Sequence, residues 1–123
     1  METGNVMAAD SALFIGWKLP VVGCEADAVE LFGSFVGYLG KQQSSGAIDS
    51  FEPCFLSPHG GDLGGFILVR GERARLAGLR SSEEFEELVS RCLVNVDGFG
   101  VVEAYVGEGV ARQMQRYTKN IRR

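Results

Sequence analysis

Residues 49–71 read DSFEPCFLSPHGGDLGGFILVRG, two apolar runs separated by a glycine-rich loop. The runs at residues 51–57 and 65–70 are rich in β-forming side chains, and the glycines between them favour a turn, so the stretch predicts an antiparallel hairpin. Its loop is longer than the commonest hairpin turns. The loop carries the only histidine of the chain, His59, three residues before Asp62.

Helical periodicity is present on both sides of this hairpin. Residues 26–43 and 83–96 each carry apolar side chains at three- and four-residue spacing, which predicts two amphipathic helices. Ser81 and Glu84 match a capping box at the start of the second helix. Gly33, Gly37 and Gly40 each weaken the first helix by up to about 1 kcal/mol relative to alanine, or instead allow close packing on the sheet. The apolar positions are Ala28, Leu31, Phe32, Phe35 and Leu39 in the first helix and Phe85, Leu88, Val89, Cys92, Leu93 and Val96 in the second.

Two further β-rich runs, residues 12–19 and 100–106, complete the order strand, helix, strand, strand, helix, strand. This order predicts an α+β fold, a ferredoxin-like βαββαβ sandwich with a four-stranded antiparallel sheet and two helices on one face. Right-handed crossovers would place the first and third strands in the middle of the sheet. Residues 72–79 predict a short helical turn with Leu76 and Leu79 pointing inward. We expect a flexible N-terminus at residues 1–11, this domain at residues 12–109, and a basic C-terminal helix at residues 110–123.

Composition places the chain among single-domain globular proteins, with 123 residues, 46% hydrophobic and 23% charged. Its three cysteines are widely spaced and form no CxxC pair, which argues against a disulfide framework and against a metal site. Buried thiols of this kind fit a reduced, cytoplasmic protein. No basic segment precedes the first apolar run, since the first basic residue is Lys18, so no secretory signal is expected. No apolar stretch approaches the roughly 20 residues of a membrane span, and nothing in the sequence calls for a cofactor.

Charge is distributed unevenly along the chain. Five of the 12 basic residues lie in residues 110–123, which hold no acidic residue, so the remainder carries seven basic and all 16 acidic residues. Such an acidic body argues against nucleic-acid binding. The C-terminal segment could be a membrane-surface or nucleic-acid helix, but we favour a helix that covers the sheet edge or clasps a partner subunit. Its apolar side would consist of Val110, Met114, Tyr117 and Ile121.

Strand alternation divides the predicted sheet into two faces. The first is wholly apolar and should receive the helices: Leu13, Ile15, Trp17, Leu19, Phe51, Pro53, Phe55, Ile67, Val69, Val102, Ala104 and Val106. The second mixes apolar and charged groups: Phe14, Gly16, Lys18, Glu52, Cys54, Leu56, Phe66, Leu68, Arg70, Val101, Glu103 and Tyr105. A sheet face left in water should be mostly polar. We therefore expect the second face to pair with a second copy across a two-fold axis, giving a homodimer.

The stretch FEP…SPHGGDLGGFILVRG, followed by LRSSEEFEELV and GFGVVEAYVGE, resembles small bacterial proteins of the dimeric α/β-barrel superfamily. In that superfamily two ferredoxin-like subunits pack sheet to sheet, and the resemblance covers residues 12–108. It implies a barrel-like homodimer but no single activity, because such barrels include monooxygenases, isomerases, haem enzymes and proteins without known activity. One similar group, the YCII-like proteins, is associated with a His/Asp pair. The only counterpart here is His59 with Asp62.

Two candidate sites follow. His59 could act as a general base oriented by Asp62, which would suit a cofactor-independent small-molecule oxygenase or isomerase; otherwise the two residues satisfy turn hydrogen bonds. The second site would bind a small ligand between the paired sheets; otherwise its charged groups form structural ion pairs. It comprises Lys18, Glu52, Arg70, Glu103 and Tyr105. The sequence leaves open whether the protein is an enzyme, and we prefer a cytoplasmic homodimer that holds a small ligand between its sheets.

Overall fold

The computed structural model describes residues 10–122, so most of the predicted flexible segment 1–11 lies outside the described residues. Residue 11 already belongs to the first strand. The elements follow one another as β1 (Ser11–Trp17), β2 (Leu19–Pro20), α2 (Glu25–Ser44), β3 (Ser50–Phe55), β4 (Gly65–Gly71), α3 (Arg73–Arg80), α4 (Glu83–Asn95), β5 (Val96–Asp97), β6 (Gly100–Tyr105) and α5 (Glu108–Lys119). Among these residues, no helix combines the length and apolarity needed to cross a membrane.

The four long strands form one antiparallel sheet in the order β3-β4-β1-β6, with β1 and β4 in the middle as predicted. The first strand is shorter than residues 12–19, because the chain leaves the sheet after Trp17. Leu19 and Pro20 instead pair with Asp97 and Val96 in a separate two-stranded sheet, β2-β5. This small sheet ties the exit of β1 to the end of α4.

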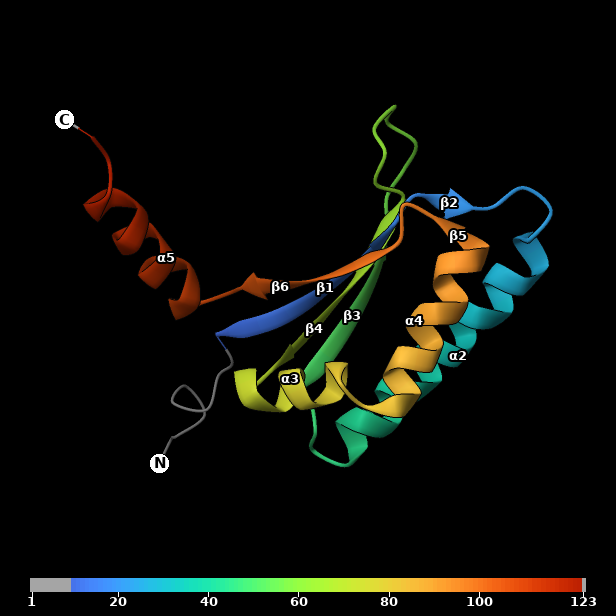
Figure 1. Ribbon diagram of the computed structural model, residues 1–123, viewed down its shortest axis with the longest axis horizontal. Helices are drawn as coiled ribbons and strands as arrows, with labels where there is room; N and C mark the ends of the chain where they lie inside the picture. The colour runs from blue at the N-terminus through green and yellow to red at the C-terminus, as the bar shows by residue number, and fades with distance from the viewer. Residues whose placement is uncertain (1–9, 123) are drawn as a thin grey trace.

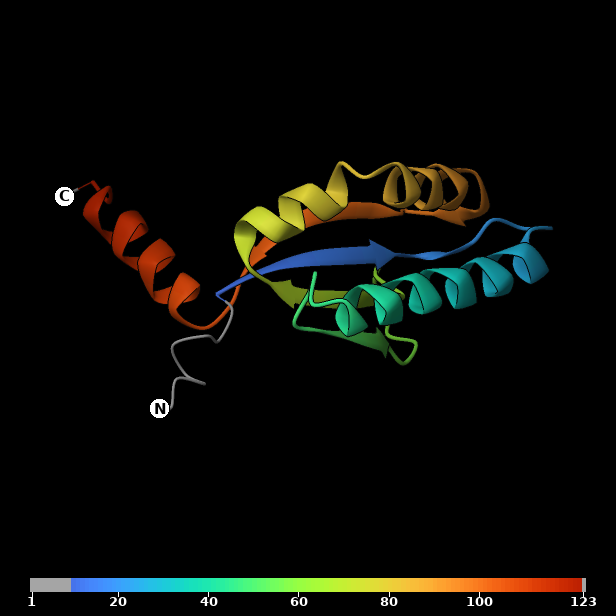
Figure 2. The ribbon, with the colours of Figure 1, turned by 90° about the horizontal axis from the view of Figure 1, so that it is seen from below.

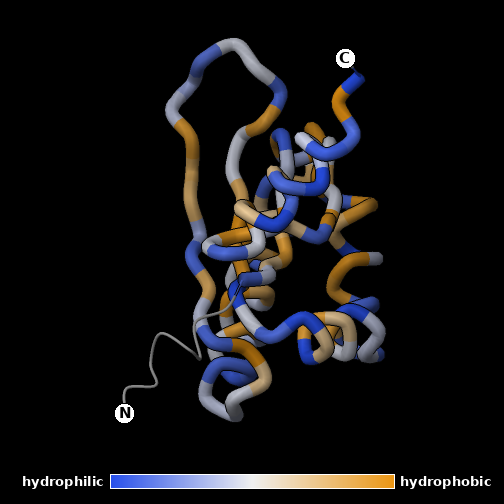
Figure 3. The backbone as a smooth tube through the Cα atoms, turned by 90° about the vertical axis from the view of Figure 1, so that its left-hand side faces the viewer, coloured by the Kyte–Doolittle hydropathy of each residue, from blue (hydrophilic) through white to orange (hydrophobic). Residues whose placement is uncertain are grey.

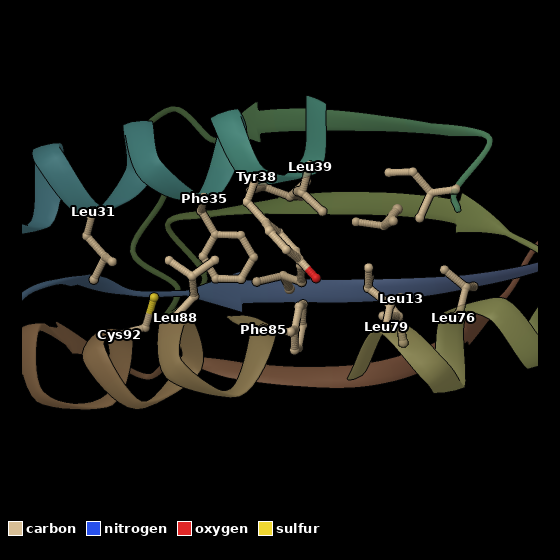
Figure 4. Close-up of a cluster of buried hydrophobic side chains, with 14 residues drawn as sticks. Leu13, Leu31, Phe35, Tyr38, Leu39, Leu76, Leu79, Phe85, Leu88 and Cys92 are labelled. Atoms are coloured by element: carbon tan, nitrogen blue, oxygen red, sulfur yellow. The ribbon is translucent and has the colours of Figure 1, made fainter. Parts of the chain in front are cut away.

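Helices α2 and α4 lie side by side across one face of the sheet, and α3 continues the same layer (Figures 1 and 2). Their apolar stripes meet the inward side chains of β1 and β4 in a single core (Figure 4). Removing this apolar surface from water supplies most of the stabilisation of the fold. The largest side chains with less than 2% exposure are Phe85, Leu13, Ile15, Leu39, Ile67 and Val69. The predicted inward positions Leu76 and Leu79 of α3 are also buried.

The N-terminus of α4 is capped one residue later than the sequence predicts. Ser82 is the N-cap, and its hydroxyl oxygen accepts a hydrogen bond from the backbone N–H of Phe85 at 3.3 Å. Ser81 instead donates to the carbonyl oxygens of Ala77 and Gly78 at the end of α3. Because two serines stand side by side between two helices, the sequence alone did not distinguish the cap from the preceding helix end.

The glycines of α2 do not mediate close packing. A Cβ atom placed on Gly33, Gly37 or Gly40 would have no atom within 4 Å, apart from its chain neighbours and the nearby backbone of its own helix. Gly33 and Gly37 are exposed, because they lie on the helix side away from Leu31 and Phe35, which face the sheet. Of the two alternatives, close packing of these glycines on the sheet is therefore wrong.

The face assignment of the last strand was also wrong. In the β1–β6 register, Leu13 lies opposite Glu103, Phe14 opposite Val102, and Ile15 opposite Val101. Residues directly opposite each other share a face. The side covered by the helices therefore receives Val101, Glu103 and Tyr105, whereas Val102 and Ala104 belong to the open face. The sequence GVVEAYV is apolar at consecutive positions, so alternation could not define which set faces the core.

Candidate functional site

An apolar cavity of about 380 Å³ lies between the helices and the sheet, at the end of the sheet where β1 finishes. Its inner wall includes Ile15 of β1 and Ile67 of β4, each 1% exposed. Ala28 contributes only a methyl group from α2, which leaves space between that helix and the sheet. Pro20 and Val96, from the β2-β5 pair, close the end. The cavity thus forms where the two helices and the small sheet meet.

Aromatic rings dominate one side of this cavity. The ring centroid of Trp17 lies 6.0 Å from that of Phe32 and 6.2 Å from that of Phe55, and both pairs meet edge to face. The ring centroids of Phe32 and Phe55 are 5.2 Å apart. Phe55 is 70% exposed and therefore lies at the surface. Phe35 and Phe99, whose ring centroids are 6.5 Å apart, also line the cavity. Aromatic faces and edges arranged in this way offer stacking and edge contacts to a flat apolar molecule.

The electrostatic character of the cavity is neutral. None of its lining residues carries a charge, and Cys92 supplies its only thiol. Burial raises the pKa of the Cys92 thiol to about 11, so the sulfur stays protonated near neutral pH and is a poor nucleophile. The cavity therefore has the properties of a binding site for an apolar molecule and lacks a group for acid–base or nucleophilic chemistry.

The predicted catalytic pair lies elsewhere, in the loop between β3 and β4. His59 is exposed, and its Nδ1 lies 2.9 Å from the carbonyl oxygen of Ser57. The Asp62 side chain is 94% exposed and lies 3.7 Å from Nζ of Lys18. Neither His59 nor Asp62 lines the apolar cavity. This geometry fits the turn-forming alternative, and a catalytic role for the pair remains a prediction.

The five residues predicted to bind a ligand between the sheets are not gathered together. Arg70 and Glu52 do meet on the open face, with Nη1 and Oε1 3.5 Å apart. Lys18 pairs with Asp62 instead. Glu103 and Tyr105 lie on the helix side of β6, where the Glu103 carboxylate is 3.6 Å from Nε of Arg73 on α3. The inverted face of β6 separates Glu103 and Tyr105 from the open face, and Lys18 is separate because the chain leaves the four-stranded sheet after Trp17.

The residue pattern does not indicate the apolar cavity, although it predicts that several of the lining residues face the core. A cavity is space that side chains fail to fill, and no residue pattern specifies it directly. One available signal was the crowding of aromatic residues at strand ends that meet in space. Trp17 ends β1, Phe55 ends β3, and Phe99 immediately precedes β6.

The four-stranded antiparallel sheet with helices on one face defines a ferredoxin-like α+β protein. A similar solved structure is a dimeric protein of unknown function and ferredoxin-like fold from Bacteroides fragilis, with a TM-score of 0.55 and 11% sequence identity. The match covers 77% of this chain and 94% of that chain. At this identity the similarity concerns the fold alone. No protein-family model matches the sequence, and no curated protein sequence is significantly similar to it.

Proposed function

We propose that this protein is a homodimer that binds a small, neutral, largely aromatic molecule in the cavity between its helices and its sheet. The cavity volume of about 380 Å³ carries this proposal, because it falls within the usual range for ligand pockets, roughly 300–1,000 Å³. An apolar ligand would gain from removal of its surface from water. A charged ligand would lose its hydration without compensation, since no charged side chain lines the cavity.

The proposed dimer is supported by the composition of the open sheet face. Leu68, Phe14 and Val102 lie directly across from one another on β4, β1 and β6. Phe14 also stacks on Phe66, with ring centroids 5.1 Å apart. An apolar row of this kind favours burial against a second copy, and the similar protein from Bacteroides fragilis is dimeric. Pairing the two sheets would give a dimeric α/β barrel.

The predicted ligand site between the sheets would be smaller than the sequence suggested. On the open face, Glu52 and Arg70 form the charged pair available to a polar ligand. These two groups are already 3.5 Å apart, so they also satisfy each other as an interface ion pair. We therefore place the principal ligand site in the apolar cavity.

Trp17 provides a direct test, because it is the only tryptophan of the chain and lines the cavity. Titration with naphthalene, used as a neutral flat probe, should change the Trp17 fluorescence saturably. Ala28→Leu should fill part of the cavity and weaken binding about tenfold or more. Ala26→Leu is the matched control, because Ala26 is an exposed residue of the same helix. The control should bind as the wild type does.

Two results would contradict the ligand proposal. One is a wild-type protein whose Trp17 fluorescence does not saturate with naphthalene. The other is an Ala28→Leu variant, shown to be folded by its far-UV circular dichroism, that binds naphthalene as tightly as the wild type. Either result would show that the cavity is not a binding site for molecules of this class.

A further inference from the structure

Helix α5 projects from the rest of the chain with its apolar side uncovered. It leaves the end of β6 and extends away from α2 and α4, on the side of the sheet that those helices do not cover (Figures 1 and 2). Hydrophobic and hydrophilic residues alternate along it, as the colouring of Figure 3 shows near the C-terminus. Its apolar side chains and their exposed fractions are Val110 48%, Met114 56% and Tyr117 68%. Ile121, 48% exposed, follows just after the C-cap Asn120, so the helix ends before the predicted residue 123.

The base of this helix is nevertheless fixed to the body. Gly109 is buried, and a Cβ atom at this position would overlap the carbonyl oxygen of Asp10. The same carbonyl accepts a hydrogen bond from the Val106 N–H at 3.1 Å. The guanidinium of Arg112 pairs with the Asp10 carboxylate and thereby lowers the pKa of Asp10. The first turn of α5 is therefore held in a defined direction, while the following turns extend from the body.

An exposed helix of this length needs a partner. A helix of 12 residues is marginal in water unless its apolar side is packed against another surface. We propose that α5 is a dimer clasp, which packs Val110, Met114 and Tyr117, together with Ile121 just beyond the helix, against the second copy of this chain beside the paired sheet faces. This inference rests on the proposed homodimer and assigns to α5 a second contact between the same two subunits.

Position and charge both favour a second copy of this chain as the molecule that covers the apolar side of α5. The open sheet face and α5 are two uncovered apolar surfaces on the same side of one molecule, so a single two-fold axis can bury both. All five charged residues within 110–123 are basic, whereas the rest of the chain has 16 acidic and seven basic residues. The basic side of α5 would therefore approach a partner body of opposite net charge.

The dimensions of the helix also suit this arrangement. Twelve residues of α-helix extend about 18 Å, close to the width of a four-stranded sheet, about 19 Å at 4.8 Å per strand. Helix α5 is therefore long enough to span the width of the partner's sheet at one end of its strands. Two-fold symmetry produces the contact twice, which helps the dimer to reach the roughly 1,200–2,000 Å² of a stable interface.

Sedimentation equilibrium of matched full-length variants tests the clasp. Met114→Glu places a charge within the apolar side of α5, whereas Gln115→Glu makes the same change in charge at a neighbouring exposed residue outside it. Met114→Glu should raise the dissociation constant of the dimer about 100-fold, which corresponds to tenfold for each of the two symmetry-related contacts. Gln115→Glu should leave the dimer constant within about threefold of the wild-type value. An unchanged constant for Met114→Glu in a dimeric protein would overturn the clasp and leave the dimer intact.

Hydrogen exchange gives an independent test on the unmodified protein. Amide protection of α5 should increase as the protein concentration is raised through the dimer constant, while protection in the core of α4 serves as the internal reference. Protection of α5 that does not change with concentration overturns the clasp. Protection that appears only on adding vesicles of anionic phospholipid also overturns it, in favour of a membrane-surface helix. A wild type that remains monomeric would overturn both dimer and clasp, whereas naphthalene binding at Trp17 would still report on the ligand site.

Discussion

Leu13 of β1 and Glu103 of β6 lie directly opposite each other in the antiparallel register and therefore share one face of the sheet. Leu13 is 1% exposed beneath the helices, whereas Glu103, on the edge strand, lies 3.6 Å from Arg73 of α3. The next pair, Phe14 and Val102, consequently shares the open face. Compared with the faces predicted from the sequence, this register removes the charged Glu103 from the open face and adds the apolar Val102 to it.

Replacement of Leu68 by Asp should split the proposed dimer. Leu68 lies opposite Phe14 in the apolar row of the open face, and two-fold symmetry would place two new carboxylates in the interface. Burial of an unpaired charge is strongly unfavourable, so we expect a monomer at micromolar concentration by sedimentation velocity. Val102→Asp should have the same effect, because Val102 belongs to the same row.

Val94→Asp is the matched control for this prediction. Val94 is 69% exposed on α4, so the same chemical change should leave both fold and dimer intact. If the Leu68→Asp protein is as dimeric as the wild type, the subunits pair through another surface. If Val94→Asp also dissociates the dimer, the helix side takes part in the interface.

The sequence predicted those elements whose residue patterns have only one interpretation. The hairpin of β3 and β4 has a glycine-rich loop between two β-rich runs, and α4 has an unbroken apolar stripe, so both were correctly placed. The strand β6 has no clear alternation because Val101 and Val102 are adjacent. Its face depends on hydrogen-bond register with β1, which a single-residue shift reverses.

The candidate site was harder to predict because it depends on contacts between distant segments. Lys18 pairs with Asp62 only because the β3–β4 loop returns to the end of β1, where the Gly64 N–H donates to the Trp17 carbonyl oxygen at 2.7 Å. The apolar cavity likewise depends on how far α2 stands from the sheet near Ala28. Periodicity identifies which side of an element faces inward, but it does not specify such spacings.

Replacement of Gly33 by Ala should stabilise the protein. The added methyl group would meet no atom within 4 Å outside its own surroundings in α2. Alanine favours a helix over glycine by up to about 1 kcal/mol, partly because it restricts the unfolded chain. The free energy of unfolding in urea should therefore increase by about 0.5–1 kcal/mol.

Gly64→Ala is the contrasting variant and should destabilise the protein. A Cβ atom on Gly64 would overlap the Lys18 carbonyl oxygen, which is backbone and cannot rotate away. The loop must then separate from the end of β1, so we expect a loss of about 1–3 kcal/mol in the same urea measurement. Equal stabilities of the two variants would show that the loop does not approach β1 as described.

The stability of the protein should fall with rising pH above 9 because of Cys92. Burial raises the pKa of this thiol from 9.0 to about 11 in the folded state. Above pH 9 the unfolded chain therefore loses this proton while the folded chain still holds it, so ionisation favours unfolding. The free energy of unfolding should decline through the interval up to about pH 11, by at most about 1.4 kcal/mol per pH unit from this group.

Comparison with Cys92→Val isolates this contribution, because the other titrating groups are common to both proteins. Valine is apolar and similar in size to cysteine, and it has no proton to lose. Urea unfolding of both proteins at pH 8.0, 9.5 and 10.5 should therefore show the wild type losing stability relative to the variant as pH rises. A stability difference that stays constant over this range would mean that the Cys92 thiol ionises equally in both states. The Cys92 side chain would then not be shielded from water between α4 and the sheet. The proposal that this thiol stays protonated and leaves the ligand cavity uncharged would lose its support.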